Sequence, residues 1–390
     1  MRLTVHDSID DIPAADWNHL DGQGNPFVRH EFLAALEHHG CVGERFGWLP
    51  QHLTAEDGDG RLLGAVPLYL KDNSYGEFVF DWAWAEAYER AGIPYYPKLV
   101  SAMPYTPAPG PRLLTAPDTA RQPVTEALIG ASLEHAQQLG VSSLHWLFTS
   151  DEETRLLEQH GLVRRTGCQF HWFNENFRDF DDFLDTFTSA KRKKLKRERR
   201  RTIEAGLDIE VVHGHEASEE QIATAEMFYR TTFDKKWGFA TLNLGFFQEV
   251  ARTLGPQLVL VLARDAGRYV AGAICFRGAD ALYGRHWGCV AEYHSLHFEL
   301  CYYQGIDYCI REGLSRFEPG AQGEHKVSRG FRPTPTWSAH WIADGRFRSA
   351  IADFVTREAG GMEHYMQELT EHLPFKNLQT TPLATETSGF

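Results

Sequence analysis

The chain has 390 residues, of which 43% are hydrophobic and 13% aromatic, and its formal net charge at pH 7 is −14. This composition excludes a mostly disordered chain, and the acidic balance argues against general coating of nucleic acid. No apolar run reaches the ~20 residues that span a bilayer, and the polar start lacks the pattern of a secretory signal. Six scattered cysteines without a Cys-x-x-Cys pair indicate reduced thiols. We therefore expect a cytoplasmic protein without a membrane span.

The N-terminal part of the sequence predicts a mixed succession of helices and strands. Apolar residues at helical spacing predict a helix over 121–139. Pro67 lies inside the apolar run 62–70, so that run is expected to form an edge or bulged strand. The other expected elements are helices over 26–39 and 152–160 and strands over 77–80, 144–148 and 163–173. We expect an N-terminal domain over 1–165 and a C-terminal domain over 166–390.

The C-terminal part begins with helices and continues with closely spaced strands. A basic helix is expected over 189–205, where Gly206 ends it. The run 258–262 is apolar at every position, which is typical of an inner strand of a sheet. Turn residues predict antiparallel strands after it, and apolar spacing predicts a helix over 296–312 packed on them. The remaining expected elements are strands over 207–212, 269–276, 281–287 and 336–342, a short strand at Phe317, and helices over 180–187, 219–233, 246–254 and 347–369.

The basic helix is a candidate for ligand binding. Lys191–Arg201 holds nine basic residues and one acid. Nine cations cannot share one helix face, so we expect the helix to be exposed nearly all round. The ordinary interpretation is a solvated surface, and the functional one is contact with a phosphate-rich partner such as tRNA. The candidates for phosphate contact are Lys191, Lys193, Lys194 and Arg200.

A glycine-rich segment over 315–335 has the highest density of chemically active side chains. Its glycines allow a backbone to approach a ligand closely. We predict that the part from Gly320 to Lys326 lines the main cleft, with His325 and Lys326 facing the ligand and Glu318 at the end of the preceding strand. Because a carboxylate and an imidazole suit general acid–base catalysis, the catalytic candidates are Glu318, His325 and Lys326. The alternative is a polar surface loop.

Two other regions supply candidates for substrate binding. Arg285 and His286 are neighbours on an expected strand, so one of them faces the core or the cleft; a histidine in such a place is more often a core residue. In the N-terminal part, aromatics, prolines and single charges alternate over 71–112, which suits a polar ligand such as a sugar or peptide. The alternative there is a rigid, well-packed loop. The binding candidates are Lys71, Glu77, Asp81, Lys98, Tyr105, Arg285, His286, Gln322 and Arg329.

One spacing resembles a metal site. His294, His297 and Glu299 are close enough in sequence to ligate zinc. The segment lacks the His-Glu-x-x-His pattern, and the chain has 19 histidines, so such a spacing arises readily by chance. We interpret the segment as the start of a helix and expect no metal.

The sequence resembles the FemAB-like predicted N-acyltransferases, a peptidoglycan biosynthesis or recognition family of the GNAT superfamily. The resemblance extends from about residue 26 to residue 358. The block 320–326, GAQGEHK, is its most specific part. The other blocks are 47–50 (GWLP), 67–71 (PLYLK), 76–81 (GEFVFD), 95–98 (YYPK), 191–193 (KRK) with 198–199 (ER), 236–238 (KWG), 282–285 (LYGR), 296–299 (LHFE) and 301–305 (CYYQG).

This resemblance implies an α/β (α+β) fold with two GNAT-like acyltransferase domains in tandem, here with a basic helical insertion. It also implies acyl or aminoacyl transfer to an amine, since characterised Fem-type relatives add amino acids from aminoacyl-tRNA to a peptidoglycan precursor. No catalytic residue is settled for this branch of the family, so the catalytic candidates above come from the residues alone.

The donor is therefore expected to be acyl-CoA or aminoacyl-tRNA. The GNAT loop that binds the CoA pyrophosphate has a Gln/Arg-x-x-Gly-x-Gly/Ala pattern, and 288–295 (GCVAEYHS) departs from it, which favours a donor other than CoA. The expected function is N-acyl transfer to a small-molecule or cell-envelope precursor such as a peptidoglycan precursor. The alternative is a non-catalytic module that binds peptidoglycan fragments or RNA, and amine-dependent turnover of a donor distinguishes the two.

Overall fold

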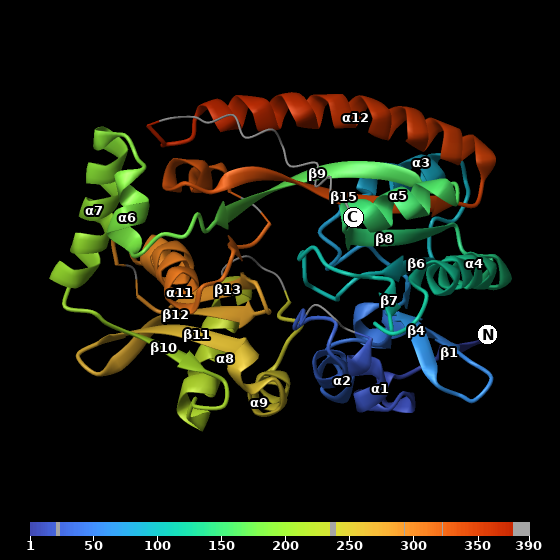
Figure 1. Cartoon of the computed structure of the whole chain (residues 1–390), viewed down its shortest axis with the longest axis horizontal. Coiled ribbons are helices and arrows are strands. Elements are labelled where there is room, and N and C mark those ends of the chain that lie inside the picture. Colours follow the sequence, from blue (N-terminus) through green and yellow to red (C-terminus); the bar gives the residue numbers. More distant parts are fainter. Residues whose placement is uncertain (21–23, 235–238, 292, 322, 377–390) are drawn as a thin grey trace.

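The protein folds around two β-sheets with helices packed on them (Figure 1). The computed structural model describes residues 1–20, 24–234, 239–291, 293–321 and 323–376, so Gln322 and the block 236–238 lie outside the described residues. The smaller sheet is antiparallel and belongs to the N-terminal half. Its order is β1 (Arg2–His6), β3 (His52–Glu56), β4 (Leu62–Val66) and β7 (Leu114–Thr115).

The larger sheet has eleven strands and joins both halves of the chain. Its order is β10 (Asp208–His213), β11 (Leu258–Asp265), β12 (Arg268–Arg277), β13 (Ala281–Cys289), β14 (Arg316–Glu318), β9 (Val163–Phe173), β15 (Arg332–Ile342), β8 (Ser143–Thr149), β6 (Lys98–Ser101), β5 (Tyr69–Lys71) and β2 (Trp48–Pro50). Strands β10 to β13 are antiparallel, whereas β14 is parallel to β13.

Helices pack on both sheets. In the N-terminal half they are α1 (Ala14–His19), α2 (His30–His38), α3 (Trp82–Arg90), α4 (Arg121–Leu139) and α5 (Asp151–Gln159). The others are α6 (Phe180–Asp185), α7 (Ser189–Glu204), α8 (Glu219–Asp234), α9 (Leu244–Thr253), α10 (Leu296–Phe298), α11 (Gln304–Glu312) and α12 (Gly345–Glu371). No helix in the described ranges is long and apolar enough to cross a membrane.

Strand β9 is shared by the two halves. Most of β9 pairs with β15, and its last two residues, Trp172 and Phe173, pair with β14. Strand β15 pairs on its other side with β8, so the C-terminal part of the chain returns to the N-terminal half. Helix α12 then runs along β9 and β15 (Figure 1). The boundary expected at residue 165 falls inside β9.

Most of the elements expected from periodicity are confirmed. The helix over 121–139 and the strand over 163–173 have the expected bounds, and β11 is buried from Leu258 to Ala263. The helix over 296–312 packs on β11 to β13 as expected, but a π-helical turn at Glu299–Tyr303 interrupts it.

Two expected strands of the N-terminal half are wrong in detail. The run 62–70 divides at Pro67 into β4 and β5, which belong to different sheets, because proline has no N–H for a ladder. Residues 77–80 form no strand, since Phe78 has the left-handed backbone angle φ 61° and the chain enters α3 at Trp82. The backbone over 74–81 is therefore a loop and is not part of a strand ladder.

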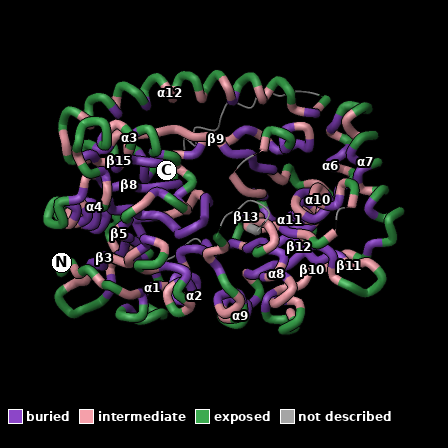
Figure 2. Tube along the Cα trace, turned by 180° about the vertical axis from the view of Figure 1, so that it is seen from behind, coloured by how far each residue is buried: buried purple, intermediate pink, exposed green. Residues whose placement is uncertain are grey.

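Aromatic side chains hold the two halves together. Phe27, just before α2, lies 5.3 Å from Phe276 of β12, and Phe32 of α2 lies 5.7 Å from Phe246 of α9. All four are buried in one core that spans both halves. Figure 2 shows buried residues concentrated in the central strands, while α12 is exposed along much of its outer side. The continuous core and the shared sheet fix the relative position of the halves.

We expect the contact between α8 and β13 to be intolerant of a side chain at Gly288. A Cβ atom there would lie 1.8 Å from the carbonyl oxygen of Phe228. Gly288→Ala should therefore lower the free energy of unfolding by about 1–3 kcal/mol, measured by urea denaturation. Gly130→Ala, in the middle of α4 with no atom within 4 Å of the new Cβ, is the control and should be neutral or stabilising. Equal effects of the two substitutions would contradict this packing.

Candidate functional site

The strands β13 and β14 diverge after a short parallel pairing. They pair at only three positions, the last of which joins Tyr283 to Glu318. Beyond it, β13 continues to Cys289, while the other chain turns away at Pro319 and Gly320. Polar groups at the carboxyl ends of parallel strands collect at such a divergence. The glycine-rich segment thus leaves the sheet at the point where the ladder opens.

Glu318 lies at this divergence and is buried, with 4% of its surface exposed. Its Oε1 accepts a hydrogen bond of 2.9 Å from Nε of Arg316. Its Oε2 is buried, accepts no hydrogen bond from any described residue, and lies 4.0 Å from Nε2 of His171. Burial raises the pKa of Glu318 to about 7, although Arg316 opposes the rise. A carboxyl with a free oxygen and this pKa can exchange a proton at neutral pH.

Lys326 holds the glycine-rich loop from inside. The sequence predicted that its ammonium faces the ligand, but the side chain is 2% exposed and its Nζ donates to the carbonyl oxygen of Gly320 over 2.6 Å. Burial lowers the pKa of Lys326 to about 8. Lys326 therefore faces its own loop and not the ligand as predicted, because a backbone carbonyl of that loop is its partner.

His325 is an exposed residue of the same segment. Its Nε2 lies 2.8 Å from the hydroxyl of Tyr302, in the π-helical turn. Burial of the ring and the nearby cation of Arg329 lower the pKa of His325. Arg329 itself is buried and bound to Glu198 of α7, so it forms part of the protein interior rather than a free anion site.

Arg285 and Tyr105 meet where the two halves touch. The guanidinium of Arg285 donates to the carbonyl oxygen of Tyr105, whose hydroxyl donates to the carbonyl oxygen of Cys41 over 2.7 Å. Burial lowers the pKa of Arg285 to about 10. The ring centroid of His286 lies 4.6 Å from that of Tyr229. A register shift in the β12–β13 ladder leaves Arg285 without a partner, so the two neighbours face the same core instead of alternating. Two of these candidates therefore lie at the junction, and His286 packs against α8.

The four charged candidates of the N-terminal half form one buried cluster. Nζ of Lys98 lies 2.8 Å from Oε2 of Glu77 and also bonds to Asp81. The ammonium of Lys71 lies 3.8 Å from the ring centroid of Trp48 and 3.9 Å from Oε1 of Glu77. Burial raises the pKa of Glu77 to about 7; for Asp81 burial acts in the same direction, but Lys98 prevails and holds the pKa at about 2. These four side chains are buried and engaged with one another, so they are not free to bind a ligand.

An aromatic cavity of about 310 Å³ lies next to this cluster. It joins the loop over 74–82 to the glycine-rich segment, because Ala321 forms part of its wall. Tyr75 is 70% exposed, and the carbonyl oxygen of Phe80 accepts a 2.8 Å bond from Arg165 of β9. The complete lining is Ser74, Tyr75, Gly76, Phe78, Phe80, Trp82 and Ala321. The sequence showed these aromatics but predicted a strand over 77–80, so it missed the wall that they form together.

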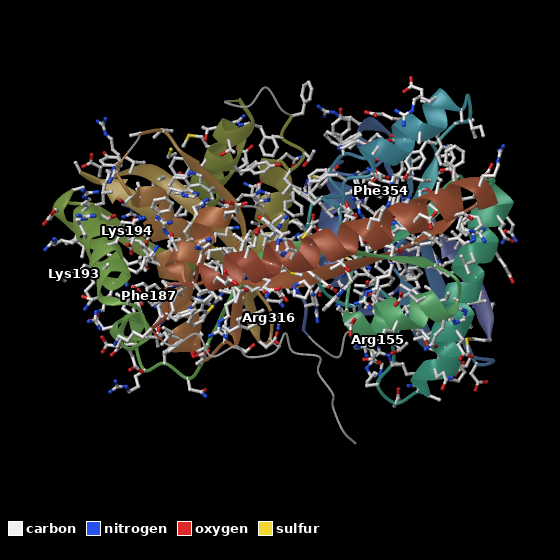
Figure 3. All side chains as sticks on the ribbon, turned by 90° about the horizontal axis from the view of Figure 1, so that it is seen from above. Arg155, Phe187, Lys193, Lys194, Arg316 and Phe354 are labelled. Carbon is white, nitrogen blue, oxygen red and sulfur yellow. The ribbon has the colours of Figure 1, made fainter. Side chains whose placement is uncertain are left out.

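The basic helix is observed as α7, Ser189–Glu204, close to its expected bounds. The expectation of exposure nearly all round is wrong, because Leu195, Glu198 and Thr202 are buried along one face. Among the phosphate candidates, Lys193, Lys194 and Arg200 are exposed and Lys191 is half-buried. Lys193 and Lys194 lie on α7 at the edge of the molecule (Figure 3).

A second hollow, of about 450 Å³, lies between the end of α7 and the segment after β13. Its lining residues are Arg201, Glu204, Ala205 and His294. Glu299, which the sequence grouped with His294 and His297, instead accepts a 3.1 Å bond from Arg199. No three histidine, cysteine or acidic residues gather as a metal site in the part of the chain that the structure describes.

Comparisons with known proteins agree with this architecture. A family model described as peptidoglycan biosynthesis/recognition, FemAB-like, matches residues 8–377. Among solved structures, FemX has a TM-score of 0.54 at 11% identity, over 90% of this chain and 100% of its own. The C-terminal domain of a putative lysylphosphatidylglycerol synthetase from Agrobacterium fabrum has a TM-score of 0.52 at 11% identity, over 90% and 97%. No curated sequence matches significantly.

These likenesses concern the fold. They confirm the expected α/β arrangement of two GNAT-like units in tandem. The basic helix lies against the π-helical turn. At 11% identity the solved structures assign no residue of this chain to a role.

We expect Glu318 to make the stability of the protein depend on pH. Its pKa is about 7 in the folded chain and near 4.5 in an unfolded one. Between these values the folded state keeps a proton that the unfolded state releases, so stability falls as pH rises from about 4.5 to about 7. Glu318→Gln should remove this part of the fall in urea unfolding measured across that range. Glu324→Gln, an exposed carboxylate of the same segment, should retain it. Identical profiles for wild type and Glu318→Gln would contradict the assignment.

Proposed function

The chain belongs to the FemAB-like family of peptidoglycan biosynthesis and recognition, and from that premise we propose that it transfers an acyl or aminoacyl group to an amine of a cell-envelope precursor. The observation that carries the proposal is Glu318, a buried carboxyl with an unbonded oxygen at the divergence of β13 and β14. Such a group is suited to take the proton of an attacking amine.

The reaction requires little covalent chemistry from the protein. A neutral amine attacks the carbonyl carbon of the donor, a C–N bond forms, and the ester or thioester bond of the donor breaks. The nitrogen loses a proton in this step, and Glu318 accepts it. The leaving oxygen or sulfur then takes a proton back. With a pKa of about 7, Glu318 can both accept and return this proton near neutral pH.

The edge of β13 is suited to hold the carbonyl group of the donor. After Tyr283, no strand in the described ranges pairs with β13 on the side of β14. Backbone N–H groups at an unpaired strand edge can donate to an oxyanion as it forms. Gly284 allows the chain after β14 to stay close to this edge, since a Cβ there would lie 3.2 Å from the Cα of Pro319.

For the donor, α7 supports a phosphate-rich molecule. Its solvent side presents Lys193, Lys194 and Arg200, and the 450 Å³ hollow at its end connects the helix to the segment after β13. The sequence of that segment departs from the CoA-binding pattern, which favours aminoacyl-tRNA over acyl-CoA. The aromatic cavity at Ala321, on the N-terminal half, supports the acceptor, a small molecule or peptidoglycan precursor.

We expect Glu318→Gln to reduce turnover by ~10²-fold or more while the fold survives. The assay is mass spectrometry of amide product from acyl-CoA and aminoacyl-tRNA donors with amine-bearing peptidoglycan precursors. In wild type, kcat should rise with pH and reach half of its maximum near pH 7, where Glu318 loses its proton.

The control for this assay is Glu324→Gln, which should retain turnover. Full turnover in Glu318→Gln would exclude Glu318 as the base. Binding of precursors without turnover of any donor would favour the alternative, a non-catalytic module.

We expect charge reversal on α7 to weaken donor binding selectively. Lys193→Glu with Arg200→Glu should lower affinity for unacylated tRNA at least tenfold, and wild-type affinity should fall steeply with salt. The matched control is Arg90→Glu with Arg155→Glu, two exposed arginines of α3 and α5. Fluorescence anisotropy measures both. Equal losses in the two proteins would indicate non-specific attraction, and no loss in either would leave α7 as a solvated helix.

A further inference from the structure

Helix α7 is rich in cations, but the charged residue on its buried face is an acid, Glu198. Glu198 is 7% exposed and Arg329, which follows the glycine-rich loop, is 3% exposed. Nη2 of Arg329 lies 3.2 and 3.1 Å from the two carboxylate oxygens of Glu198. The hydroxyl of Tyr303 also donates to Glu198. This ion pair ties α7 to the loop, because separating two oppositely charged buried groups is costly.

The same guanidinium also fixes the backbone of the loop. Nη1 of Arg329 donates to the carbonyl oxygen of His325 over 2.8 Å, and its Nε donates to the hydroxyl of Tyr303 over 3.1 Å. The Cζ atom of Arg329 lies 3.5 Å from the ring centroid of Phe298. All three guanidinium nitrogens of Arg329 donate hydrogen bonds, and its flat face packs on an aromatic ring. Only an arginine side chain can make this combination of contacts.

The π-helical turn completes the link. Tyr302 and Tyr303 are its last two residues, and their hydroxyls go to different partners. Tyr302 meets the ring of His325 at 2.8 Å, while Tyr303 meets Glu198. Turns of this kind are rare and frequent at functional sites. The ring of His325 is thus held by the π-helical turn, which lies against α7, and its carbonyl oxygen is held by Arg329.

We propose that Glu198 and Arg329 are positioning residues through which α7 sets the conformation of His325 and its loop. A phosphate-rich molecule on the solvent face of α7 then changes the reactive loop through the buried face of the same helix. This inference rests on the proposed function only for the nature of that molecule. The link itself is measurable without turnover.

The chain offers a matched control on the same helix. Arg199, next to Glu198, is partly buried and pairs with Glu299 at 3.1 Å and Asp307 at 2.6 Å. These partners lie in the π-helical turn and α11, not in the glycine-rich loop. Arg199→Gln therefore breaks a comparable ion pair of α7 without touching Arg329.

The first experiment is amide hydrogen exchange over residues 323–331, followed by mass spectrometry. Glu198→Gln should accelerate exchange there at least tenfold, whereas Arg199→Gln should leave it unchanged. Arg329→Lys keeps the positive charge but cannot bridge Glu198 and His325 together, so it should accelerate exchange as well. If Glu198→Gln or Arg329→Lys exchanges at the wild-type rate, the proposed link between α7 and the loop is overturned. Equal acceleration in Arg199→Gln would overturn it as well. If Glu198→Gln does not fold, Arg329→Lys alone decides.

The second experiment adds unacylated tRNA and follows the imidazole NMR signal of His325, assigned with His325→Gln. In wild type the signal should move on binding. In Arg329→Lys, binding should persist within twofold, because the solvent face of α7 is unchanged, and the signal should not respond. A response equal to wild type would overturn the coupling. Absence of tRNA binding in wild type would overturn the donor assignment, while the exchange experiment still decides the link.

Discussion

The position of β14 is the constraint on which the rest of the structure depends. This three-residue strand lies between β13 and β9, so it joins the strands of the C-terminal half to those of the N-terminal half in one sheet. Its pairing with β13 ends at Glu318, and the ladder opens there. The same short strand therefore connects the two halves of the sheet. It also ends where β13 and β14 diverge, and the candidate base, Glu318, lies at that point.

Around this divergence the protein stabilises its buried charges by pairing them. Lys98 lies between Glu77 and Asp81, Arg329 lies against Glu198, and Arg316 lies against Glu318. Burial of a charge without a partner is costly, so these pairs fix the loops that contain them. Glu318, like Glu77 and Asp81, keeps one oxygen unbonded, and it differs from them by lying at the divergence of β13 and β14. A rigid surrounding and one free oxygen are what a proton-accepting group requires.

Local patterns predicted the elements well, and long-range contacts explain where they did not. Apolar spacing was sufficient for α4 and β9, whose faces follow simple periods. The buried states of Lys326 and Arg329 could not be predicted, since each needs a partner that the sequence does not indicate; Glu198 is 131 residues from Arg329. The buried face of α7 was missed for the same reason. Glu318 was predicted at the end of a strand and is found there.

The most direct test of the account is a crystal structure with an unreactive donor analogue, either a ketone-bearing thioether of CoA or an aminoacyl-tRNA in which an amide replaces the ester. The account places the donor carbonyl at the edge of β13 beyond Tyr283, with its carbon next to the carboxyl of Glu318 and its phosphate-bearing part towards α7. An analogue bound with its carbonyl away from the divergence of β13 and β14 would contradict the central claim.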